Sequence, residues 1–332
     1  MNLSDKINAF EKLGFLCRNL VGEENNPIFQ QILLQNECFT KQNVIQSLIA
    51  VSNLLIRSEI EKWIYSYDLN LLTKSKKIGV FLAGNIPLVG FHDFLCVLIL
   101  NHKFIAKLSS KDSILFNYLI NQLLIIEPRF KSKIFLQSNI LDSDIFICTG
   151  NDFSAKYFDF KFNKKPKIIR GSKTSVAILD GRETDEDIKL LMKDVFLYFG
   201  LGCRSVTKLY IPKNYNIESL KKYFLEYKYF LKYRFYVDNY KYYKTIYKFK
   251  KDIFFHYESI LLLESKELFS PISVLYYERY NEISDISLDL SKIQCVVSKK
   301  NNYNSIPFGV SQNPTLFDYA DNIDTIDFLL KN

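Results

Sequence analysis

A cysteine lies between glycines where an expected helix meets a strand, in the segment Phe199-Gly200-Leu201-Gly202-Cys203-Arg204-Ser205. A thiol at such a junction can expose its sulfur and aim its own backbone N–H at a bound substrate. This arrangement suits a nucleophile, because the thiolate attacks and neighbouring N–H groups stabilise the oxyanion that forms. Gly200 and Gly202 permit close approach, since a β-carbon there would crowd the substrate. Taken alone, the residues favour a small buried cysteine in a tight turn.

Three loops after expected strands, and one segment before a strand, carry groups that can bind a substrate or a nucleotide. Asn85 follows a buried strand, and its amide can donate to a developing oxyanion. Lys107 ends the next strand, beside Ser109 and Ser110, and can reach a ribose or a phosphate. The segment Cys148-Thr149-Gly150-Asn151 runs into a helix start, whose N–H groups favour a pyrophosphate. The fourth segment is Glu267-Leu268-Phe269-Ser270-Pro271.

The elements that must position these groups alternate from Lys77 onward. The residues before Lys77 predict helices, with a helix start at Asn26-Pro27. Short apolar strands then alternate with helices, which predicts an α/β fold with a mostly parallel sheet covered on both faces, where ligands bind at the carboxyl ends of the strands. The expected strands are Ile78–Ala83, Phe104–Leu108, Ile134–Leu136, Ile145–Thr149, Ile168–Ile169 and Val176–Leu179, and the expected helices are Leu88–Leu100, Asp112–Glu127, Ser154–Phe162 and Thr184–Phe199.

A second region begins after Cys203. Its expected strands are Val206–Ile211, Phe255–Leu263, Ile272–Tyr277 and Cys295–Ser298, with a helix over Asn281–Leu290. The stretch Lys221–Lys251 holds ten basic residues among many tyrosines. We interpret it as a solvated helix face rather than a nucleic-acid surface, and docking of an acidic acyl carrier or of coenzyme A phosphates stays open.

Composition excludes several classes of protein. Six cysteines without a Cys-x-x-Cys pair and three scattered histidines argue against a zinc site, and no metal is expected. The longest apolar run, Ile86–Leu100, is interrupted by His92 and Asp93 and is too short to span a bilayer. The absence of a signal-peptide pattern predicts a reducing, cytoplasmic location. The net charge of +8 favours anionic partners only weakly.

In this order and spacing, the segments resemble the aldehyde dehydrogenase superfamily. Its members carry in succession an Asn-x-Pro loop, a Lys-Pro-Ser-Glu segment, a Thr-Gly-Ser turn, a Gly-x-x-Cys nucleophile and a Glu-x-Phe-Gly-Pro segment. The closer likeness is to the acyl-CoA reductase family typified by the fatty-acid reductase subunit of bacterial luminescence. The stretches that carry it are Gly84-Asn85-Ile86-Pro87-Leu88-Val89-Gly90-Phe91-His92-Asp93-Phe94, Tyr198-Phe199-Gly200-Leu201-Gly202-Cys203-Arg204, Phe269-Ser270-Pro271-Ile272-Ser273-Val274 and Asp318-Tyr319-Ala320-Asp321.

The resemblance implies an aldehyde-dehydrogenase-like fold, with a Rossmann-like cofactor domain, an α/β catalytic domain and a helical N-terminal segment. It implies that Cys203 attacks an acyl thioester while Asn85 and the Cys203 N–H hold the oxyanion. Expulsion of the carrier thiol leaves an acyl-enzyme, which hydride from a nicotinamide reduces to an aldehyde. The implied cofactor residues are Lys107 at the adenosine ribose with Ser109 and Ser110 beside it, Gly150 and Asn151 near the pyrophosphate, and Glu267 and Phe269 at the nicotinamide ribose.

Departures from the superfamily pattern sharpen these expectations. Ile169-Arg170-Gly171-Ser172-Lys173 stands where hydrolytic members place Glu-Leu-Gly-Gly-Lys. The carboxylate that would activate water is missing, which favours thioester reduction over aldehyde oxidation. Ser110 with Lys111 replaces an acid of NAD-preferring members, which favours NADPH over the alternative NADH. Asn151 replaces the Ser of the Thr-Gly-Ser turn. The chain is also shorter than the luminescence enzymes, which leaves the acyl chain length open.

These expectations divide the chain into a helical segment 1–75, an NAD(P)-binding domain 76–199, a catalytic domain 200–304 and a C-terminal segment 305–332 that packs on the first domain or on a partner subunit. An acyl-CoA or acyl-carrier substrate and a homo-oligomer are expected, with an acyl-transferring partner protein left open. The alternatives are an acyl-phosphate reductase of the same superfamily and an inactive binding protein. His92 is interpreted as structural rather than facing the thioester. Arg204 either promotes thiolate formation, meets a coenzyme phosphate, or pairs with a carboxylate.

Overall fold

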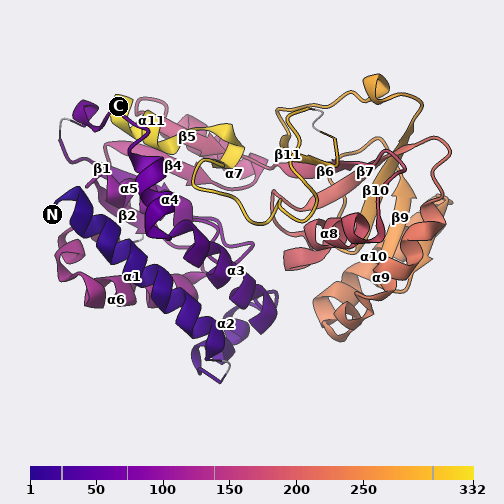
Figure 1. Cartoon of the computed structure of the whole chain (residues 1–332), viewed down its shortest axis with the longest axis horizontal. Coiled ribbons are helices and arrows are strands. Elements are labelled where there is room, and N and C mark those ends of the chain that lie inside the picture. The colour runs from indigo at the N-terminus through magenta and orange to yellow at the C-terminus, as the bar shows by residue number, and fades with distance from the viewer. Residues whose placement is uncertain (24, 73, 138, 301–302) are drawn as a thin grey trace. The chain divides into compact units, whose positions relative to one another are not determined.

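The computed structural model describes residues 1–332 except 24, 73, 138 and 301–302. The described chain divides into two compact units (Figure 1). The first unit comprises Met1–Ser172 together with Pro314–Asn332, and the second comprises Lys173–Asn313. Each unit is built on its own β-sheet.

Helices open the first unit, as the sequence predicts. The side chain of Asn2 accepts a hydrogen bond from the Asp5 N–H at 2.8 Å, in a capping box that starts the first helix. Buried apolar side chains recur along one face of this helix and of the third, and the two pack against each other. These elements are α1 (Leu3–Gly22), α2 (Ile28–Gln35), α3 (Lys41–Leu54), α4 (Arg57–Ile64) and the 3-10 turn η1 (Leu69–Leu71).

The sheet of the first unit has the strand order β3-β2-β1-β4-β5, and all its pairings are parallel. The order reverses between β1 and β4, so the carboxyl ends of these two strands form a switch point of the kind where ligands bind. The strands are β1 (Lys77–Phe81), β2 (Lys103–Lys107), β3 (Ile134–Leu136), β4 (Ile145–Thr149) and β5 (Lys167–Arg170), and the connecting helices are α5 (Phe91–Ile99), α6 (Ser113–Ile126), η2 (Pro128–Ser132) and α7 (Asp152–Lys161).

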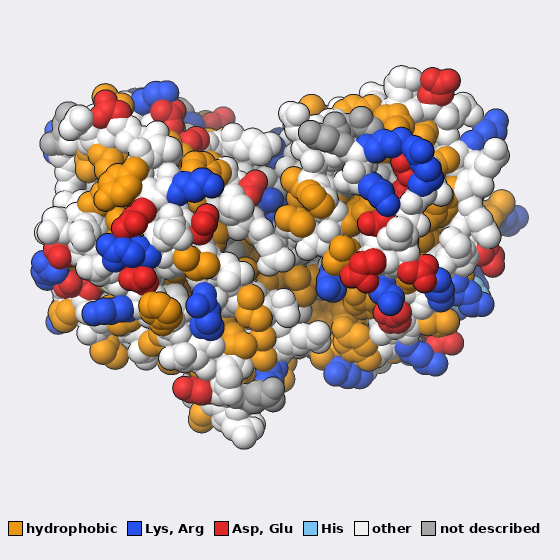
Figure 2. Space-filling model, in the orientation of Figure 1, with side chains coloured by type: hydrophobic (Ala, Val, Ile, Leu, Met, Phe, Trp, Pro, Cys, Tyr) orange, Lys and Arg blue, Asp and Glu red, His pale blue; other side chains and the backbone are white. Residues whose placement is uncertain are grey.

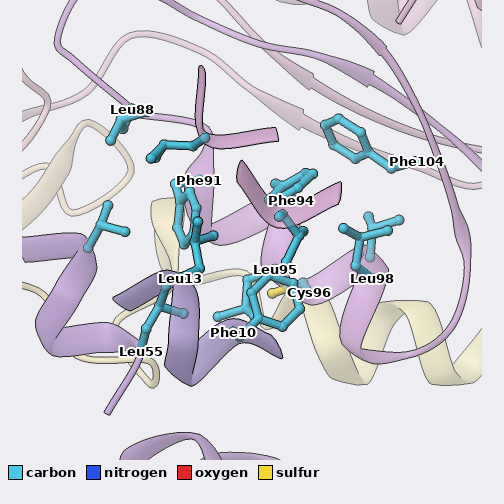
Figure 3. Packing of buried hydrophobic residues seen from close by; sticks show 14 of the residues in the cluster. Phe10, Leu13, Leu55, Leu88, Phe91, Phe94, Leu95, Cys96, Leu98 and Phe104 are labelled. Atoms are coloured by element: carbon cyan, nitrogen blue, oxygen red, sulfur yellow. The ribbon is translucent and has the colours of Figure 1, made fainter. Parts of the chain in front are cut away.

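Helix α5 lies in the core of the first unit, with nearly all of its side chains buried. The ring of Phe94 meets those of Phe10 from α1 and Phe104 from β2 edge-on, with ring centroids 6.3 and 5.0 Å apart. Figure 3 shows Leu13 and Leu55 in the same cluster. One hydrophobic core therefore joins the N-terminal helices to the parallel sheet.

The C-terminal residues belong to the first unit. Its last helix, α11 (Thr325–Lys331), contacts α5 and follows the 3-10 turn η7 (Ala320–Asn322). The Tyr319 hydroxyl accepts from the indole N–H of Trp63 at 2.8 Å and lies 2.8 Å from the Tyr67 hydroxyl. Tyr67 in turn donates to Asp324 at 2.7 Å. The chain from Pro314 onward thus packs against helices of its own unit.

The sheet of the second unit has the strand order β11-β6-β7-β10-β9-β8, parallel except for the antiparallel pair β8–β9. Helix α8 contacts β7, α9 contacts β8, and α10 contacts β9. The elements are β6 (Thr174–Ile178), α8 (Asp185–Phe196), η3 (Leu197–Gly200), β7 (Val206–Pro212), η4 (Ile217–Leu220), α9 (Lys221–Leu225), η5 (Lys228–Lys232), α10 (Arg234–Lys250), β8 (Phe254–Tyr257), β9 (Ile260–Glu264), β10 (Val274–Tyr280), η6 (Ile283–Asp285) and β11 (Ile293–Ser298).

The domain boundary expected at Gly200 lies earlier in the structure, between Ser172 and Lys173. Strand β6 and helix α8 belong to the second unit because β6 pairs with β7 and β11 rather than with β5. Strands and helices alternate without interruption across this point, so the local pattern does not mark it. The expected C-terminal segment also divides, since residues up to Asn313 belong to the second unit.

Two expected elements are wrong. The single strand over Phe255–Leu263 is a hairpin of β8 and β9, because Glu258 has a positive φ of 50° and turns the chain. The helix over Asn281–Leu290 is reduced to the 3-10 turn η6. The Tyr303 hydroxyl lies 3.1 and 3.0 Å from the carbonyl oxygens of Ile283 and Ile286, so part of the hydrogen bonding of this turn is to a side chain from outside it.

The basic, aromatic stretch Lys221–Lys251 forms α9, η5 and α10, and it has a buried and a solvated face, as interpreted from the sequence. Tyr236, Tyr240 and Tyr247 of α10 are buried. Lysines of the stretch remain largely exposed, and Lys228 pairs with Glu258 at 2.6 Å. The tyrosines thus serve mainly to pack α10 on the sheet, and the lysines keep their charges in water.

The described residues include no helix long and apolar enough to cross a membrane. Among the same residues, no cluster of His, Cys, Asp and Glu has the composition to hold a metal ion. All six cysteines are described, and none is in a disulfide. On the face shown in Figure 2, Lys and Arg side chains are interspersed with Asp and Glu, so the net positive charge is not gathered into one patch there.

Candidate functional site

Cys203 lies on the turn between α8 and β7 in the second unit, as the sequence predicts. After α8, Tyr198 and Phe199 have positive φ values of 55° and 57°, and Gly200 follows at 76°. Successive left-handed residues reverse the chain sharply, and glycine at the last position adopts this conformation without strain. The chain then reaches Cys203, whose side chain is half-buried immediately before β7.

Two buried serines hold the backbone on either side of the thiol. The Ser205 N–H donates to the Gly202 carbonyl at 3.0 Å, and the Ser205 Oγ accepts from the Gly202 N–H at 3.2 Å. The Ser175 Oγ of β6 donates to the Cys203 carbonyl at 3.0 Å. Neither serine has exposed surface. The turn is therefore fixed by hydroxyl groups that water does not reach.

The other thiols are poor nucleophiles by their surroundings. Cys295 of β11 lies with its Sγ 3.0 Å from the Ser175 Oγ, and burial raises its pKa more than the Ser175 hydroxyl and the charge of Arg204 lower it. A raised pKa keeps a thiol protonated and unreactive at neutral pH. Burial likewise raises the pKa values of Cys17, Cys38, Cys96 and Cys148.

Glu267 and Phe269 lie on the loop between β9 and β10, also in the second unit. The Thr207 Oγ1 donates to the Leu268 carbonyl at 2.6 Å, and the buried Lys208 ammonium donates to the Lys266 carbonyl at 3.0 Å. Thr207 and Lys208 are on β7, the strand that begins just after Cys203. The structure therefore ties this loop to the strand that carries the cysteine, and both Glu267 and Phe269 are exposed.

The remaining candidate residues share one edge of the sheet in the first unit. Phe81 pairs with Lys107 on one side and with Cys148 on the other, so the chain leaves β1, β2 and β4 at the same level. The loops that follow carry Asn85 after β1, Ser109 and Ser110 after β2, and Gly150 and Asn151 after β4. Asn85, Lys107, Ser110 and Asn151 are exposed, and Ser109 and Gly150 are half-buried.

Glycines let the chain pack closely at this edge of the sheet. A β-carbon on Gly84 would lie 2.3 Å from the Ser109 Oγ, and one on Gly150 would lie 2.8 Å from the Cβ of Ser154. Helix α7 begins after Asn151, whose Oδ1 accepts from the Ser154 N–H at 2.9 Å. The first N–H groups of a helix have no intrahelical acceptor, so the start of α7 still offers donors to a pyrophosphate.

Comparison with known proteins rests on structure alone, since no protein-family model and no curated protein sequence matches the chain. Aldehyde dehydrogenase 21 from Physcomitrella patens, solved with succinate, aligns over 92% of this chain and 74% of its own, with a TM-score of 0.62 and 13% identity. The aldehyde dehydrogenase from Bartonella henselae aligns over 92% of this chain and 76% of its own, with a TM-score of 0.64 and 9% identity. A benzaldehyde dehydrogenase from Corynebacterium glutamicum aligns over 90% of this chain and 76% of its own, with a TM-score of 0.63 and 10% identity. The fold is aldehyde-dehydrogenase-like.

Asp112 joins two of the loops that carry candidate site residues, which the sequence does not reveal. An Asp before a helix predicts a cap, but this side chain leaves α6 uncapped and its Oδ2 accepts from the Leu88 N–H at 2.8 Å. The Asp112 N–H donates to the Ser109 carbonyl at 3.1 Å. Burial raises the pKa of Asp112 to about 8. Asp112 therefore ties the loop that carries Asn85 to the loop that carries Ser109.

The segment that stands in place of Glu-Leu-Gly-Gly-Lys makes structural contacts. Ile169 packs against a buried cluster that includes Phe146 and Phe162, and the Arg170 guanidinium pairs with Asp93 of α5 at 2.5 Å. Arg170 also donates to the Thr325 hydroxyl of α11 at 2.9 Å. No carboxylate replaces the missing glutamate within this described segment.

His92 has the structural role that the sequence favours. Its Nε2 lies 3.1 Å from the Leu316 carbonyl, and its ring lies against those of Trp63 and Tyr319, with centroids 5.7 and 5.0 Å apart. These contacts join α5 to the C-terminal segment of the same unit.

Proposed function

We propose that this protein reduces an acyl thioester to an aldehyde, through an acyl-enzyme on Cys203 and with NADPH as reductant. The observation that carries the proposal is the Cys203 turn. It presents a half-buried thiol on a rigid, hydroxyl-bonded backbone, in a fold whose solved examples include aldehyde dehydrogenases. Acyl-CoA and an acyl-carrier thioester are the two donors proposed.

In the proposed mechanism, the Cys203 thiolate attacks the carbonyl carbon of the thioester. The carbon forms a bond to Sγ, and the Cys203 N–H stabilises the oxyanion that forms. The bond to the carrier sulfur then breaks, and the carrier leaves as a thiol after taking up a proton. A bound reduced nicotinamide supplies the hydride that brings the acyl group to the oxidation level of an aldehyde. Cys203 is the leaving group that releases the product.

The direction toward aldehyde rests on Ile169. Hydrolysis of an acyl-enzyme needs a base that activates water, and a carboxylate near neutral pH serves this purpose. Ile169 has no ionisable group and packs among aromatic side chains. The nearby Asp152 carboxylate accepts the Ser172 N–H at 2.7 Å, which engages one of its oxygens. The acyl-enzyme should therefore persist until it is reduced.

The preference for NADPH rests on charge at the carboxyl edge of β2. Lys107, Ser110 and Lys111 are exposed there, and no acid stands at Ser110 to repel a 2′-phosphate. The start of α7 suits the pyrophosphate of the nucleotide. A related solved structure, from Bacillus cereus, is an NAD⁺ complex, so NADH is the alternative to compare.

The proposal is tested by incubating the protein with acyl-CoAs of graded chain length and following both nicotinamide oxidation and the mass of the protein. We expect an acyl adduct on Cys203, NADPH used better than NADH, and a loss of turnover of at least about a thousandfold in Cys203→Ser. Cys295→Ser is the matched control and should stay within about threefold of wild type.

Three outcomes would contradict the proposal. Turnover of acyl phosphates but not of thioesters would identify an acyl-phosphate reductase. An adduct on another residue would remove Cys203 from its role. Binding of nucleotide without an adduct or turnover with any acyl donor would indicate a binding protein that keeps only the fold.

A further inference from the structure

A segment distant in sequence reaches the nucleophile turn. The side-chain amide of Gln312 donates to the Ser205 Oγ at 3.1 Å, although 107 residues separate the two. Gln312 is only 7% exposed, and Ser205 is fully buried. The same Ser205 Oγ accepts from the Gly202 N–H, so Gln312 and the peptide between Leu201 and Gly202, one unit before the peptide that carries the Cys203 N–H, share one acceptor atom. Both contacts lie within the second unit.

Helix α8 anchors the segment that carries Gln312. The fully buried Asp194 carboxylate accepts from the N–H groups of Gly309 and Ser311 at 2.6 and 3.2 Å, and from the Ser311 hydroxyl at 2.7 Å. Gly309 has a positive φ of 80°, and a β-carbon there would lie 2.8 Å from Leu190 of α8. The segment thus fits closely against the helix that leads into the Cys203 turn, which fixes where the Gln312 amide can point.

We propose that Gln312 is a positioning residue for the acylation of Cys203, acting through Ser205 and the Gly202 N–H on the backbone of the nucleophile turn. The inference rests on the proposed function, because it assigns Gln312 to the oxyanion-forming step of that reaction. It concerns only the second unit and does not involve the cofactor.

The hydrogen-bonding capacity of serine explains the effect. A hydroxyl has two acceptor lone pairs and one donor. With N–H groups of Gly202 and Gln312 on the acceptor side, the Ser205 side chain is held in one orientation. Without the Gln312 donor, the buried Ser205 Oγ loses one of its two donors, and the side chain can rotate away from Gly202. The peptide between Leu201 and Gly202 then loses its side-chain support, and the adjoining peptide that carries the Cys203 N–H can shift with it.

Acylation and alkylation of Cys203 respond differently to such a loss. In acylation by acyl-CoA, the Sγ–carbon bond forms, an oxyanion develops on the carbonyl, and the bond to the coenzyme sulfur breaks to release coenzyme A as a thiol. In alkylation by iodoacetamide, the Sγ–carbon bond forms as iodide leaves, and no oxyanion appears. A misplaced backbone N–H therefore slows acylation alone.

The variant Gln312→Met tests the inference, since methionine has a similar length and no donor. Asn313→Ala is the matched control, because Asn313 is the next residue and its side chain is exposed. Ser205→Ala removes the shared acceptor and should resemble Gln312→Met. Each full-length variant is compared with wild type for single-turnover acylation by acyl-CoA, for iodoacetamide alkylation of Cys203, and for thermal unfolding.

We expect Gln312→Met to slow acylation at least about tenfold, with alkylation within about twofold of wild type and an unfolding temperature lowered by no more than about a few degrees, since one buried hydrogen bond is lost. Asn313→Ala should match wild type in all three measurements. Acylation of Gln312→Met at the wild-type rate would overturn the inference and leave the proposed function standing. An equal fall in acylation and alkylation would overturn it too, since Gln312 would then set access to the thiol. Wild-type protein that takes no acyl group on Cys203 would overturn the proposed function, and the inference with it.

Discussion

In the first unit, the candidate cofactor residues lie on loops at the carboxyl edge of a parallel sheet, and glycines let these loops approach one another. In the second unit, one thiol lies on a turn whose backbone is bonded to two buried serines. One of these serines accepts from Gln312, on a segment that Asp194 anchors. The contrast suits the two proposed tasks, which are binding of a dinucleotide and attack by a thiol. A dinucleotide is held by many weak contacts along an open edge, whereas a nucleophile must be placed to within a fraction of an ångström.

The buried carboxylates of the two units show the same contrast. Asp112 accepts one hydrogen bond, from the Leu88 N–H, and burial raises its pKa to about 8. Asp194 accepts three, from Gly309 and Ser311, and burial raises its pKa only to about 6, because these bonds favour the ionised form. The loops of the first unit are thus joined through Asp112, whose ionised form is destabilised by burial. The segment beside the nucleophile turn is held by Asp194, whose ionised form is stabilised by three hydrogen bonds.

The largest effect is expected from breaking the buried ion pair of the first unit. Arg170→Met leaves the Asp93 carboxylate without its cation, which should lower the free energy of unfolding by about 3–5 kcal/mol. The chain has a single tryptophan, Trp63, and it lies in the first unit, so its fluorescence follows that unit during denaturation. An unchanged midpoint of the Trp63 transition would show that the pair contributes nothing.

Lys208→Met supplies the comparison in the second unit. Lys208 is buried, but its partner Glu278 is 36% exposed, so water can solvate the carboxylate that remains. We expect a smaller loss of stability than in Arg170→Met, measured by far-UV circular dichroism over the same denaturant range. A loss equal to or larger than that of Arg170→Met would contradict the comparison.

The next largest effect is expected from the titration of Asp112, which makes the stability of the protein depend on pH. The raised pKa of Asp112 means that the folded protein binds more protons than the unfolded chain between about pH 4 and pH 8, so wild-type stability falls as pH rises through this range. Asp112→Asn does not titrate and can still accept from Leu88. Its stability relative to wild type should increase by on the order of 3 kcal/mol between about pH 5 and pH 8, and level off above.

Asp194→Asn is the counterpart for the nucleophile turn. The variant loses part of its hydrogen bonding to Gly309 and Ser311 at every pH. Its stability relative to wild type should rise with pH and level off near pH 6 rather than pH 8. Urea denaturation at a series of pH values measures both variants. If the stability of Asp112→Asn and of Asp194→Asn, each relative to wild type, depended on pH in the same way, the two carboxyl groups would not differ in pKa.

The smallest effect is expected from adding one methyl group between two loops of the first unit. Gly84→Ala places a β-carbon against the Ser109 Oγ, so the loops must separate and NADPH should bind about tenfold more weakly. Adding Ser109→Gly removes the obstructing side chain and should restore part of the affinity. Gly22→Ala, where a β-carbon meets nothing within 4 Å, is the control. Fluorescence titration with NADPH measures all three, and a lack of rescue would place the effect elsewhere.

Much of the fold and part of the candidate site could be predicted from the sequence. Alternating strands and helices predict the parallel sheet, and the helix-to-strand junction at Cys203 is where the structure has it. The hairpin turn at Glu258 lacks the Gly or Asn that usually marks a positive φ, so it could not be found. The boundary at Ser172 could not be found either, because it depends on which sheet β6 joins and not on β6 itself.

The sequence by itself determined which groups can do chemistry: a cysteine between glycines, an asparagine and a lysine after strands, and the absence of a glutamate at Ile169. These are local properties, since residue type and position relative to a strand or helix are enough to recognise them. Only the tertiary structure decided what supports them. Asp112, Ser175, Asp194 and Gln312 act through hydrogen bonds to residues from 24 to 117 positions away, and burial, which depends on the whole fold, sets their strength.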